Sequence, residues 1–154
     1  MKVIIIEDED RAARYMRKLI GQSTHNLSVL TCLSSVSEAL DWFGNNPLPD
    51  LVFSDIQLGD GTSFDIYKQL EKLPPVIFTT AYDEYALKAF KANGIDYLLK
   101  PVSPEELDAA LDKFTSFRKE EQLTIDQISR LFSSDRQNYK SRFMVKVGMK
   151  IKSI

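Results

Sequence analysis

The chain of 154 residues contains only one cysteine, one histidine and one tryptophan. The single cysteine, Cys32, excludes an intramolecular disulfide and makes a reducing cytoplasm the expected setting. The single histidine, His25, excludes a metal site built from several histidines. No apolar run approaches the roughly 20 residues that a membrane helix needs, and the first residues lead into a strand rather than a signal peptide. We therefore expect a cytoplasmic protein with no membrane partner.

Charge is unevenly distributed along the chain. Residues 1–115 carry 11 Lys and Arg against 18 Asp and Glu, a net of −7. Residues 116–154 carry 9 against 4, a net of +5, and no acidic residue occurs from Tyr139 onward. This asymmetry predicts two modules with different partners.

The first 115 residues alternate between short apolar runs and amphipathic stretches, a pattern that predicts an open α/β fold. The apolar runs lack strict polar alternation, which is typical of parallel strands buried on both faces. Strands are expected at Val3–Ile6, Leu27–Leu33, Leu51–Phe53, Val76–Thr79 and Tyr97–Leu99. Helices, with apolar residues three and four apart, are expected at Arg11–Ile20, Val36–Phe43, Phe64–Leu73, Tyr85–Ala92 and Ser103–Phe114.

The remaining residues follow a different pattern. Residues 116–134 carry a weaker apolar stripe and are expected to form a connecting helix. Residues 133–141 are polar, and residues 142–154 alternate as in the first hairpin of a β-rich module. Because an isolated two-stranded hairpin is only marginally stable in water, we expect the chain to be truncated within that module.

Side chains suited to phosphoryl chemistry follow the predicted strands. In open α/β sheets ligands bind at the carboxyl ends of the strands, so the residues at those ends are considered together. They are Glu7 and Asp8 after the first strand, Asp55 after the third, Thr79 and Thr80 at the end of the fourth, and Lys100 after the fifth.

These residue types fit together chemically. Crowded carboxylates stay ionised together only beside a cation, and oxygen ligands suit Mg²⁺ (or Mn²⁺). A lysine ammonium matches a phosphate, and a threonine hydroxyl can donate to a phosphoryl oxygen. A carboxylate can also act as the nucleophile. The set predicts phosphoryl transfer to Asp55.

Four motifs, IIIEDED, FSDIQLGDG, FTTAY and DYLLKP, resemble in order and spacing those of the receiver domain of bacterial two-component response regulators. The resemblance covers residues 1–118 and implies a flavodoxin-like fold, a five-stranded parallel sheet with five flanking helices. It implies that Asp55 accepts a phosphoryl group from a sensor histidine kinase. The protein would hydrolyse this acyl phosphate slowly and would not turn over external substrates.

The resemblance also assigns a metal site and a loop. Asp8, Asp55 and the backbone carbonyl of Gln57 would bind Mg²⁺ directly, with Glu7 near the metal. The chain departs from the family at Leu58-Gly59, where members often carry methionine and proline; this difference can alter loop stiffness. From the residues alone, Asp60 is expected in a solvated loop or at a helix cap.

The remaining implied roles concern switching. Lys100 would be the phosphate partner, and Pro101 would follow a cis peptide bond. Thr80 would be the switch hydroxyl, and Tyr97 the aromatic residue whose rotamer follows it. The surface from about Asp83 to Phe114, including the fourth helix and the fifth strand and helix, would then change and pair with a second receiver as a homodimer.

The end of the chain carries a second resemblance. YKSRFMVKVGMKIKSI resembles the opening of a LytTR-type DNA-binding domain, the output module of the LytR/AlgR class of regulators. Its basic residues suit contact with DNA phosphates. The implied organisation is a receiver domain at residues 1–118, a helical linker at 119–138 and the beginning of a DNA-binding domain at 139–154.

Two other functions remain open. A stand-alone receiver would act through protein contacts only, although the basic end of the chain argues against it. A Mg²⁺-dependent phosphatase with an aspartyl nucleophile usually needs a second aspartate two residues later as general acid. That position is Gln57, which cannot deliver a proton.

Overall fold

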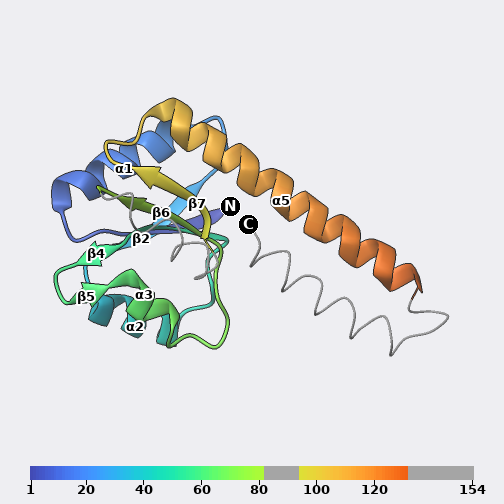
Figure 1. The fold of residues 1–154 in the computed structure, drawn as a ribbon, viewed down its shortest axis with the longest axis horizontal. Helices are drawn as coiled ribbons and strands as arrows, with labels where there is room; N and C mark the ends of the chain where they lie inside the picture. The colour runs from blue at the N-terminus through green and yellow to red at the C-terminus, as the bar shows by residue number, and fades with distance from the viewer. Residues whose placement is uncertain (82–93, 132–154) are drawn as a thin grey trace. The chain divides into compact units, whose positions relative to one another are not determined.

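The computed structural model describes residues 1–81 and 94–131 of the chain (Figure 1). It divides the chain into two compact units, Met1–Ala110 and Leu111–Ile154. The expected helix at Tyr85–Ala92 and the expected hairpin at residues 142–154 lie outside the described residues, as do residues 83–93 of the expected dimerisation surface.

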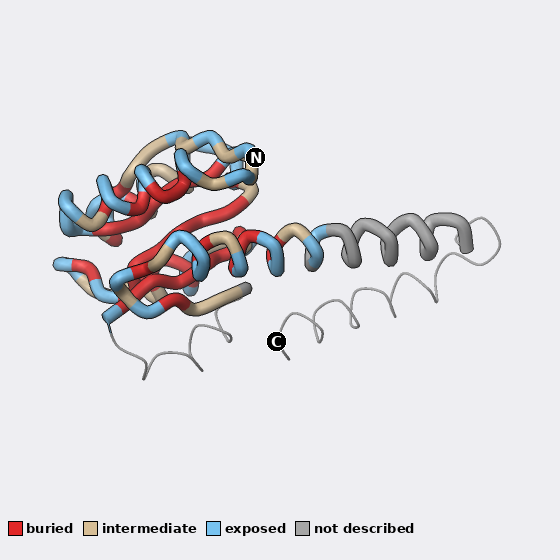
Figure 2. Tube along the Cα trace, turned by 90° about the horizontal axis from the view of Figure 1, so that it is seen from above, coloured by how far each residue is buried: buried red, intermediate tan, exposed pale blue. Residues whose placement is uncertain are grey.

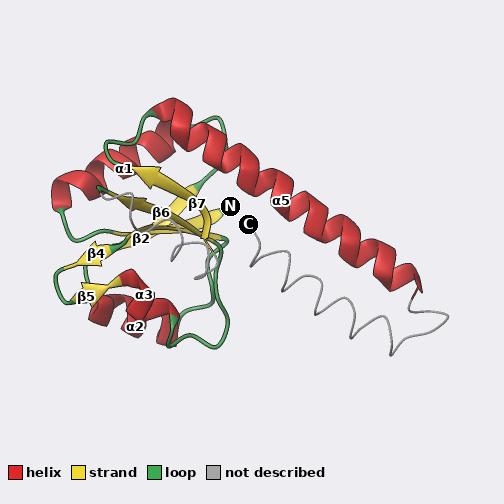
Figure 3. Cartoon of the chain, in the orientation of Figure 1, coloured by secondary structure: helices red, strands yellow, loops and turns green. Residues whose placement is uncertain are grey.

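The first unit is built on a five-stranded parallel sheet, which confirms the predicted fold class (Figure 3). Its spatial order is β2-β1-β3-β6-β7, so the direction of strand addition reverses between β1 and β3. In such sheets this reversal is where ligands bind. The strands are β1 (Lys2–Ile6), β2 (Ser28–Leu33), β3 (Leu51–Asp55), β6 (Val76–Thr80) and β7 (Gly94–Leu99).

The central strands are buried because helices cover both faces of the sheet. Every residue of β3 and β6 is buried, which explains their continuous apolar sequences. Helix α1 (Asp10–Gln22) lies on one face, while α2 (Val36–Asn45) and α3 (Ser63–Tyr67) lie on the other (Figure 1). Figure 2 shows the buried residues concentrated along the strands and the inner sides of the helices.

Helix α1 is tied to the segment that follows β7. The Tyr15 hydroxyl donates to the carbonyl of Val102 at 2.7 Å, and Ser23 Oγ donates to Asp108 Oδ1 at 3.0 Å. These bonds place α1 beside the first turns of α5 (Pro104–Leu131) within the first unit.

Helix α3 is shorter than the expected Phe64–Leu73, and that expectation was wrong at its carboxyl end. The helix begins with a capping box between Thr62 and Asp65 and ends at Tyr67. The next two bonds, from Gln69 N and Leu70 N, reach back only three residues, so the chain tightens into a turn. Pro74 and Pro75 then disfavour helical conformation in the preceding residue, and Leu73 is 42% exposed.

The last helix is longer than expected. The helices expected at Ser103–Phe114 and at residues 116–134 form one unbroken helix, α5, over Pro104–Leu131. Ser103 Oγ accepts a hydrogen bond from the backbone N–H of Glu106, and Glu105 and Glu106 complement the positive end of the helix. The proposed linker thus begins inside a continuous helix.

Among the described residues, no helix combines the length and apolar character needed to span a membrane.

The packing around Phe78 predicts a large loss of stability in Phe78→Ala. Phe78 is fully buried, and its ring lies 5.3 Å from that of Phe64 and 5.9 Å from that of Tyr67, centroid to centroid. Removing the ring leaves a cavity and should lower the free energy of unfolding by about 3–5 kcal/mol. Urea unfolding measures this loss. Leu30→Ala is the control because Leu30 is 46% exposed, and its change should stay within about 0.5 kcal/mol; equal losses would contradict the packing described.

Candidate functional site

Two acidic residues emerge from neighbouring strands at the point where the strand order reverses. β1 and β3 pair in parallel with Ile6 opposite Ser54, so Glu7 and Asp55 come next on each strand. The N–H of Glu7 donates to the carbonyl of Leu33 at 2.9 Å, which anchors this end of the chain to β2. The pairing of β1 with β3 therefore brings together two carboxylates that lie 48 residues apart in sequence.

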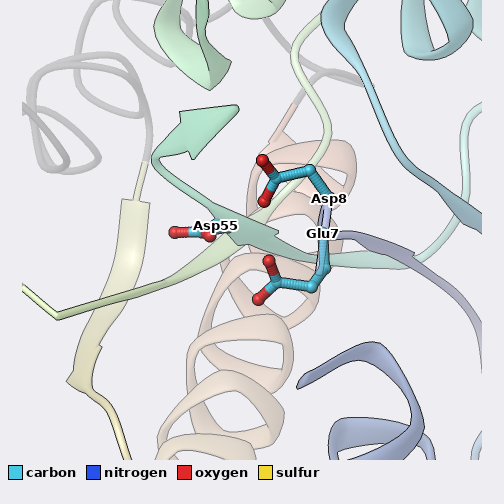
Figure 4. A group of neighbouring side chains, drawn as sticks. All are labelled: Glu7, Asp8 and Asp55. Carbon is cyan, nitrogen blue, oxygen red and sulfur yellow. The ribbon is translucent and has the colours of Figure 1, made fainter. Parts of the chain in front are cut away.

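Three carboxylates share this edge of the sheet. Glu7, Asp8 and Asp55 each offer an oxygen within 4.8 Å of the others (Figure 4). Glu7 and Asp55 are buried, whereas Asp8 is exposed. Asp8 is therefore in contact with water. The charges of the two buried acids, in contrast, are poorly solvated.

Lys100 contacts both buried acids. Its ammonium forms an ion pair with Glu7 Oε1 and a second one with Asp55 Oδ2 at 3.1 Å. Its backbone N–H donates to the carbonyl of Thr80 at 2.8 Å, which fixes its main chain beside β6. The peptide bond from Lys100 to Pro101 is cis. The sheet thus brings Glu7, Asp55 and Lys100 into direct contact.

Burial governs the protonation of Glu7. Burial raises the pKa of Glu7 from its usual 4.5 to about 7; the hydrogen bond from Lys100 opposes this shift, and the nearby Asp55 adds to it. For Lys100, burial alone would lower the pKa, but the two carboxylates outweigh it and raise the pKa above its usual value. One ammonium does not fully compensate the neighbouring acids.

Asp55 is held by its own strand end. Its Oδ1 accepts a hydrogen bond from the N–H of Ile56 at 2.7 Å, and its carbonyl accepts one from Ser54 Oγ at 3.0 Å. With Oδ2 paired to Lys100, both carboxylate oxygens have fixed partners. The Asp55 carboxylate is therefore oriented before any ligand arrives.

The threonines of β6 lie on opposite faces of the sheet. Thr79 is opposite Asp55 in the register, and Thr80, which follows it, is opposite Leu99 on β7. Because successive strand residues alternate between faces, Thr80 shares a face with Tyr97, two residues before Leu99. Thr80 is buried, and Tyr97 is half-buried against the apolar cluster on the side of α2 and α3.

A short hairpin borders the third side of the site. β4 (Gln57–Leu58) pairs antiparallel with β5 (Gly61–Thr62), and Ser63 N–H donates to the carbonyl of Ile56 at 2.8 Å. At its tip, a Cβ added to Gly59 would lie 4.0 Å from Asp8 Oδ2. Gln57 thus begins a hairpin that follows Asp55 by two residues and passes beside Asp8. The sequence did not predict these two short strands.

The side chains present suit a hard divalent cation. The cluster offers only carboxylate oxygens, and oxygen ligands are those that Mg²⁺ and Mn²⁺ prefer. A cation there would favour the charged form of Glu7, whose pKa is raised mainly by burial and further by Asp55. The acidic cluster therefore fits the expected metal.

A sequence profile described as response regulator receiver domain matches residues 3–112. The chain belongs to this family. Its curated relatives include the sensory transduction protein LytT of Bacillus anthracis, which is 36% identical over 82% of this chain and 52% of that protein. LytT of Enterococcus faecalis is 40% identical over 73% of this chain and 47% of the relative. These LytT proteins confirm the predicted kinship with the LytR class, and the chain spans about half of their length.

Solved receiver structures share the fold. The response regulatory domain of mrkE from Klebsiella pneumoniae aligns with a TM-score of 0.66 at 30% identity, covering 78% of this chain and 99% of that domain. A receiver domain from Clostridium thermocellum aligns with a TM-score of 0.65 at 27% identity, covering 77% of this chain and 96% of that domain. The flavodoxin-like receiver fold is therefore confirmed.

The receiver site predicts a specific pH dependence in the absence of divalent cations. Between pH 4.5 and about 7 the folded state binds more protons at Glu7 than the unfolded state does, so the free energy of unfolding should fall as pH rises. Glu7→Gln removes this loss, which amounts to about 3 kcal/mol at most. Chemical unfolding in EDTA at several pH values should show the variant gaining stability relative to the unmodified protein as pH rises.

The control for this experiment is Glu9→Gln. Glu9 is exposed, and only its backbone N–H contacts Glu7. Its stability relative to the unmodified protein should not change with pH in the same window. A Glu7→Gln variant whose relative stability stays constant, or falls, as pH rises would contradict the role of burial at Glu7.

Proposed function

We propose that this receiver accepts a phosphoryl group on Asp55 from a sensor histidine kinase and thereby switches an attached output module. The observation that carries the proposal is the placement of Asp55: a buried carboxylate held by Lys100, with Glu7 and Asp8 within metal-ligand distance. Such a group combines an oriented nucleophile with a fixed positive charge.

In the proposed transfer, one carboxylate oxygen of Asp55 attacks the phosphorus of a phosphohistidine. The new oxygen–phosphorus bond forms as the phosphorus–nitrogen bond breaks, and the departing imidazole keeps the electron pair. Lys100, already within 3.1 Å of Asp55 Oδ2, pairs with the phosphoryl oxygens. Its ammonium offsets charge that would otherwise add to the neighbouring acids.

The proposed metal ligands are Asp8, Asp55 and the backbone carbonyl of Gln57, with Glu7 beside them. A bound Mg²⁺ or Mn²⁺ supplies neutralisation of the charge that develops on the transferring phosphoryl group. The residues themselves orient the acceptor, since Ile56 N–H and Lys100 hold the two oxygens of Asp55.

The surface beside Lys100, which pairs with Asp55, is hollowed. A cavity of about 530 Å³ opens there between α1 and the segment after β7, and most of its walls are apolar. Its lining includes Ala12, Tyr15, Met16, Lys100, Pro101 and Val102. We propose that apolar side chains of the kinase domain pack in this cavity.

Switching is proposed to run through Thr80 and Tyr97. The two share a face of neighbouring strands, so a phosphoryl oxygen that draws in the Thr80 hydroxyl can open space for the Tyr97 ring. The resulting population shift would alter the surface from about Asp83 to Phe114 and favour pairing with a second receiver.

The proposed output is DNA binding by a LytTR-type module. Two features support it: the LytT relatives are about twice as long as the matched region, and the end of the chain is basic. The proposed partners, a histidine kinase that donates the phosphoryl group and the DNA bound by the output module, imply a cytoplasmic setting. A phosphatase of the aspartyl-nucleophile type uses a general acid two residues after the nucleophile, and here that residue is Gln57, which cannot deliver a proton. We therefore propose slow hydrolysis of the acyl phosphate rather than turnover of external substrates.

The acceptor assignment predicts loss of labelling in Asp55→Asn. With radiolabelled acetyl phosphate and Mg²⁺, the unmodified protein should become labelled, and EDTA should prevent labelling. Asp55→Asn should remain unlabelled because its amide cannot form the acyl phosphate. Asp41→Asn, at an exposed position on α2, should label normally. Persistent labelling of Asp55→Asn would refute the assignment.

A further inference from the structure

Asp60 connects the tip of the hairpin to another part of the fold. Its Oδ1 accepts a hydrogen bond from Val36 N–H at 2.8 Å, and its Oδ2 accepts one from Ser37 N–H at 3.1 Å. Both donors lie in the first turn of α2, 24 and 23 residues away in sequence. One exposed carboxylate thus joins the β4–β5 turn to the start of a helix on the sheet.

These bonds satisfy donors that have no other partner within a helix. The first four N–H groups of a helix lack intrahelical acceptors. In α2, Ser35 Oγ accepts from Glu38 N–H, while Asp60 accepts from the two N–H groups that precede it. The bonds from Val36 and Ser37 hold the pKa of Asp60 below its usual value. The carboxylate is therefore an N-terminal cap supplied by a different segment of the chain.

The path of the hairpin leaves little freedom on the other side of Asp60. Gly61 has φ of +149°, a conformation that side chains disfavour, and an added Cβ would lie 2.8 Å from Asp65 Oδ2. Asp65 Oδ2 accepts from Thr62 N–H at 3.0 Å. The return strand is thus held at α3, while the tip is held at α2.

The hairpin forms a border of the acidic site. It starts at Gln57, two residues after Asp55, and at its tip Gly59 lies beside Asp8. No proline stiffens this turn, since Leu58-Gly59 occupies the positions where family members often carry methionine and proline. The position of the turn relative to Asp8 therefore depends on bonds to the rest of the fold, and those of Asp60 are at the tip.

We propose that Asp60 is a positioning residue for the metal site: by fixing the hairpin to the start of α2, it holds Gln57 and Gly59 in place beside Asp55 and Asp8. The inference rests on the proposed function, because it concerns the cation that the acidic cluster would bind. Asp60 does not contact the cation; it acts through the main chain of the hairpin. Loss of the Asp60 carboxylate should therefore weaken metal binding more than a comparable loss elsewhere.

The test measures Mn²⁺ affinity of the full chain by electron paramagnetic resonance, together with thermal stability. Asp60→Ala removes both bonds, and Asp60→Asn keeps one acceptor oxygen. The matched control is Asp50→Ala, since Asp50 Oδ2 accepts from Lys2 N–H at 2.8 Å near the start of β1, at the opposite end of the strands. The control removes the same kind of bond far from the acidic site.

We expect Asp60→Ala to bind Mn²⁺ about 10-fold more weakly, as for other groups that orient metal ligands from outside. Asp60→Asn should retain part of the affinity, and Asp50→Ala should bind like the unmodified protein even where its melting temperature falls. Undiminished affinity in Asp60→Ala, or an equal loss in Asp50→Ala, would overturn the role of Asp60 alone. An unmodified protein that binds no Mn²⁺ would overturn the proposed metal site and this role with it.

Discussion

The contact of Lys100 with Glu7 and Asp55 is the interaction on which the site depends. It places one ammonium among acids whose oxygens lie within 4.8 Å of one another, two of them buried. Burial is the main cause of the raised pKa of Glu7; the nearby Asp55 adds to it, and the hydrogen bond from Lys100 only partly opposes it. The site therefore suits a bound cation and, beside Lys100, the phosphoryl group of the proposed function.

The order of the strands in the sheet makes this contact possible. The strand order brings β1 beside β3 and carries β7 to the end next to β6, so residues from three distant segments meet at one edge. The central strands tolerate this because their apolar faces are covered on both sides. The hairpin after Asp55 closes the remaining side, and Asp60 and Asp65 hold it against two helices on the same face of the sheet.

The sequence predicted what depends on local pattern, and it failed where tertiary contacts decide. Continuous apolar runs identified the strands, but β7 begins at Gly94 rather than Tyr97, because glycine and Asp96 weaken the strand pattern there. The expected length of α3 was wrong because the chain tightens into a turn after Tyr67 and two prolines follow, although the apolar stripe continues. Of the residues expected from the strand ends, Glu7, Asp8, Asp55 and Lys100 meet at one edge of the sheet. The hydrogen bond between Asp60 and the start of α2 joins residues 24 positions apart. The Asp60-Gly61 pair indicates a turn, but it does not indicate which donors the Asp60 carboxylate binds.

The central claim is that crowding of carboxylates makes this edge of the sheet a cation site. The most direct test is an NMR titration of the Glu7 carboxyl carbon without and with saturating Mg²⁺. Without the ion, the account predicts a pKa of about 7; with it, the pKa should fall toward the usual 4.5, because the ion favours the charged carboxylate. A Glu7 pKa that Mg²⁺ leaves unchanged would contradict the account.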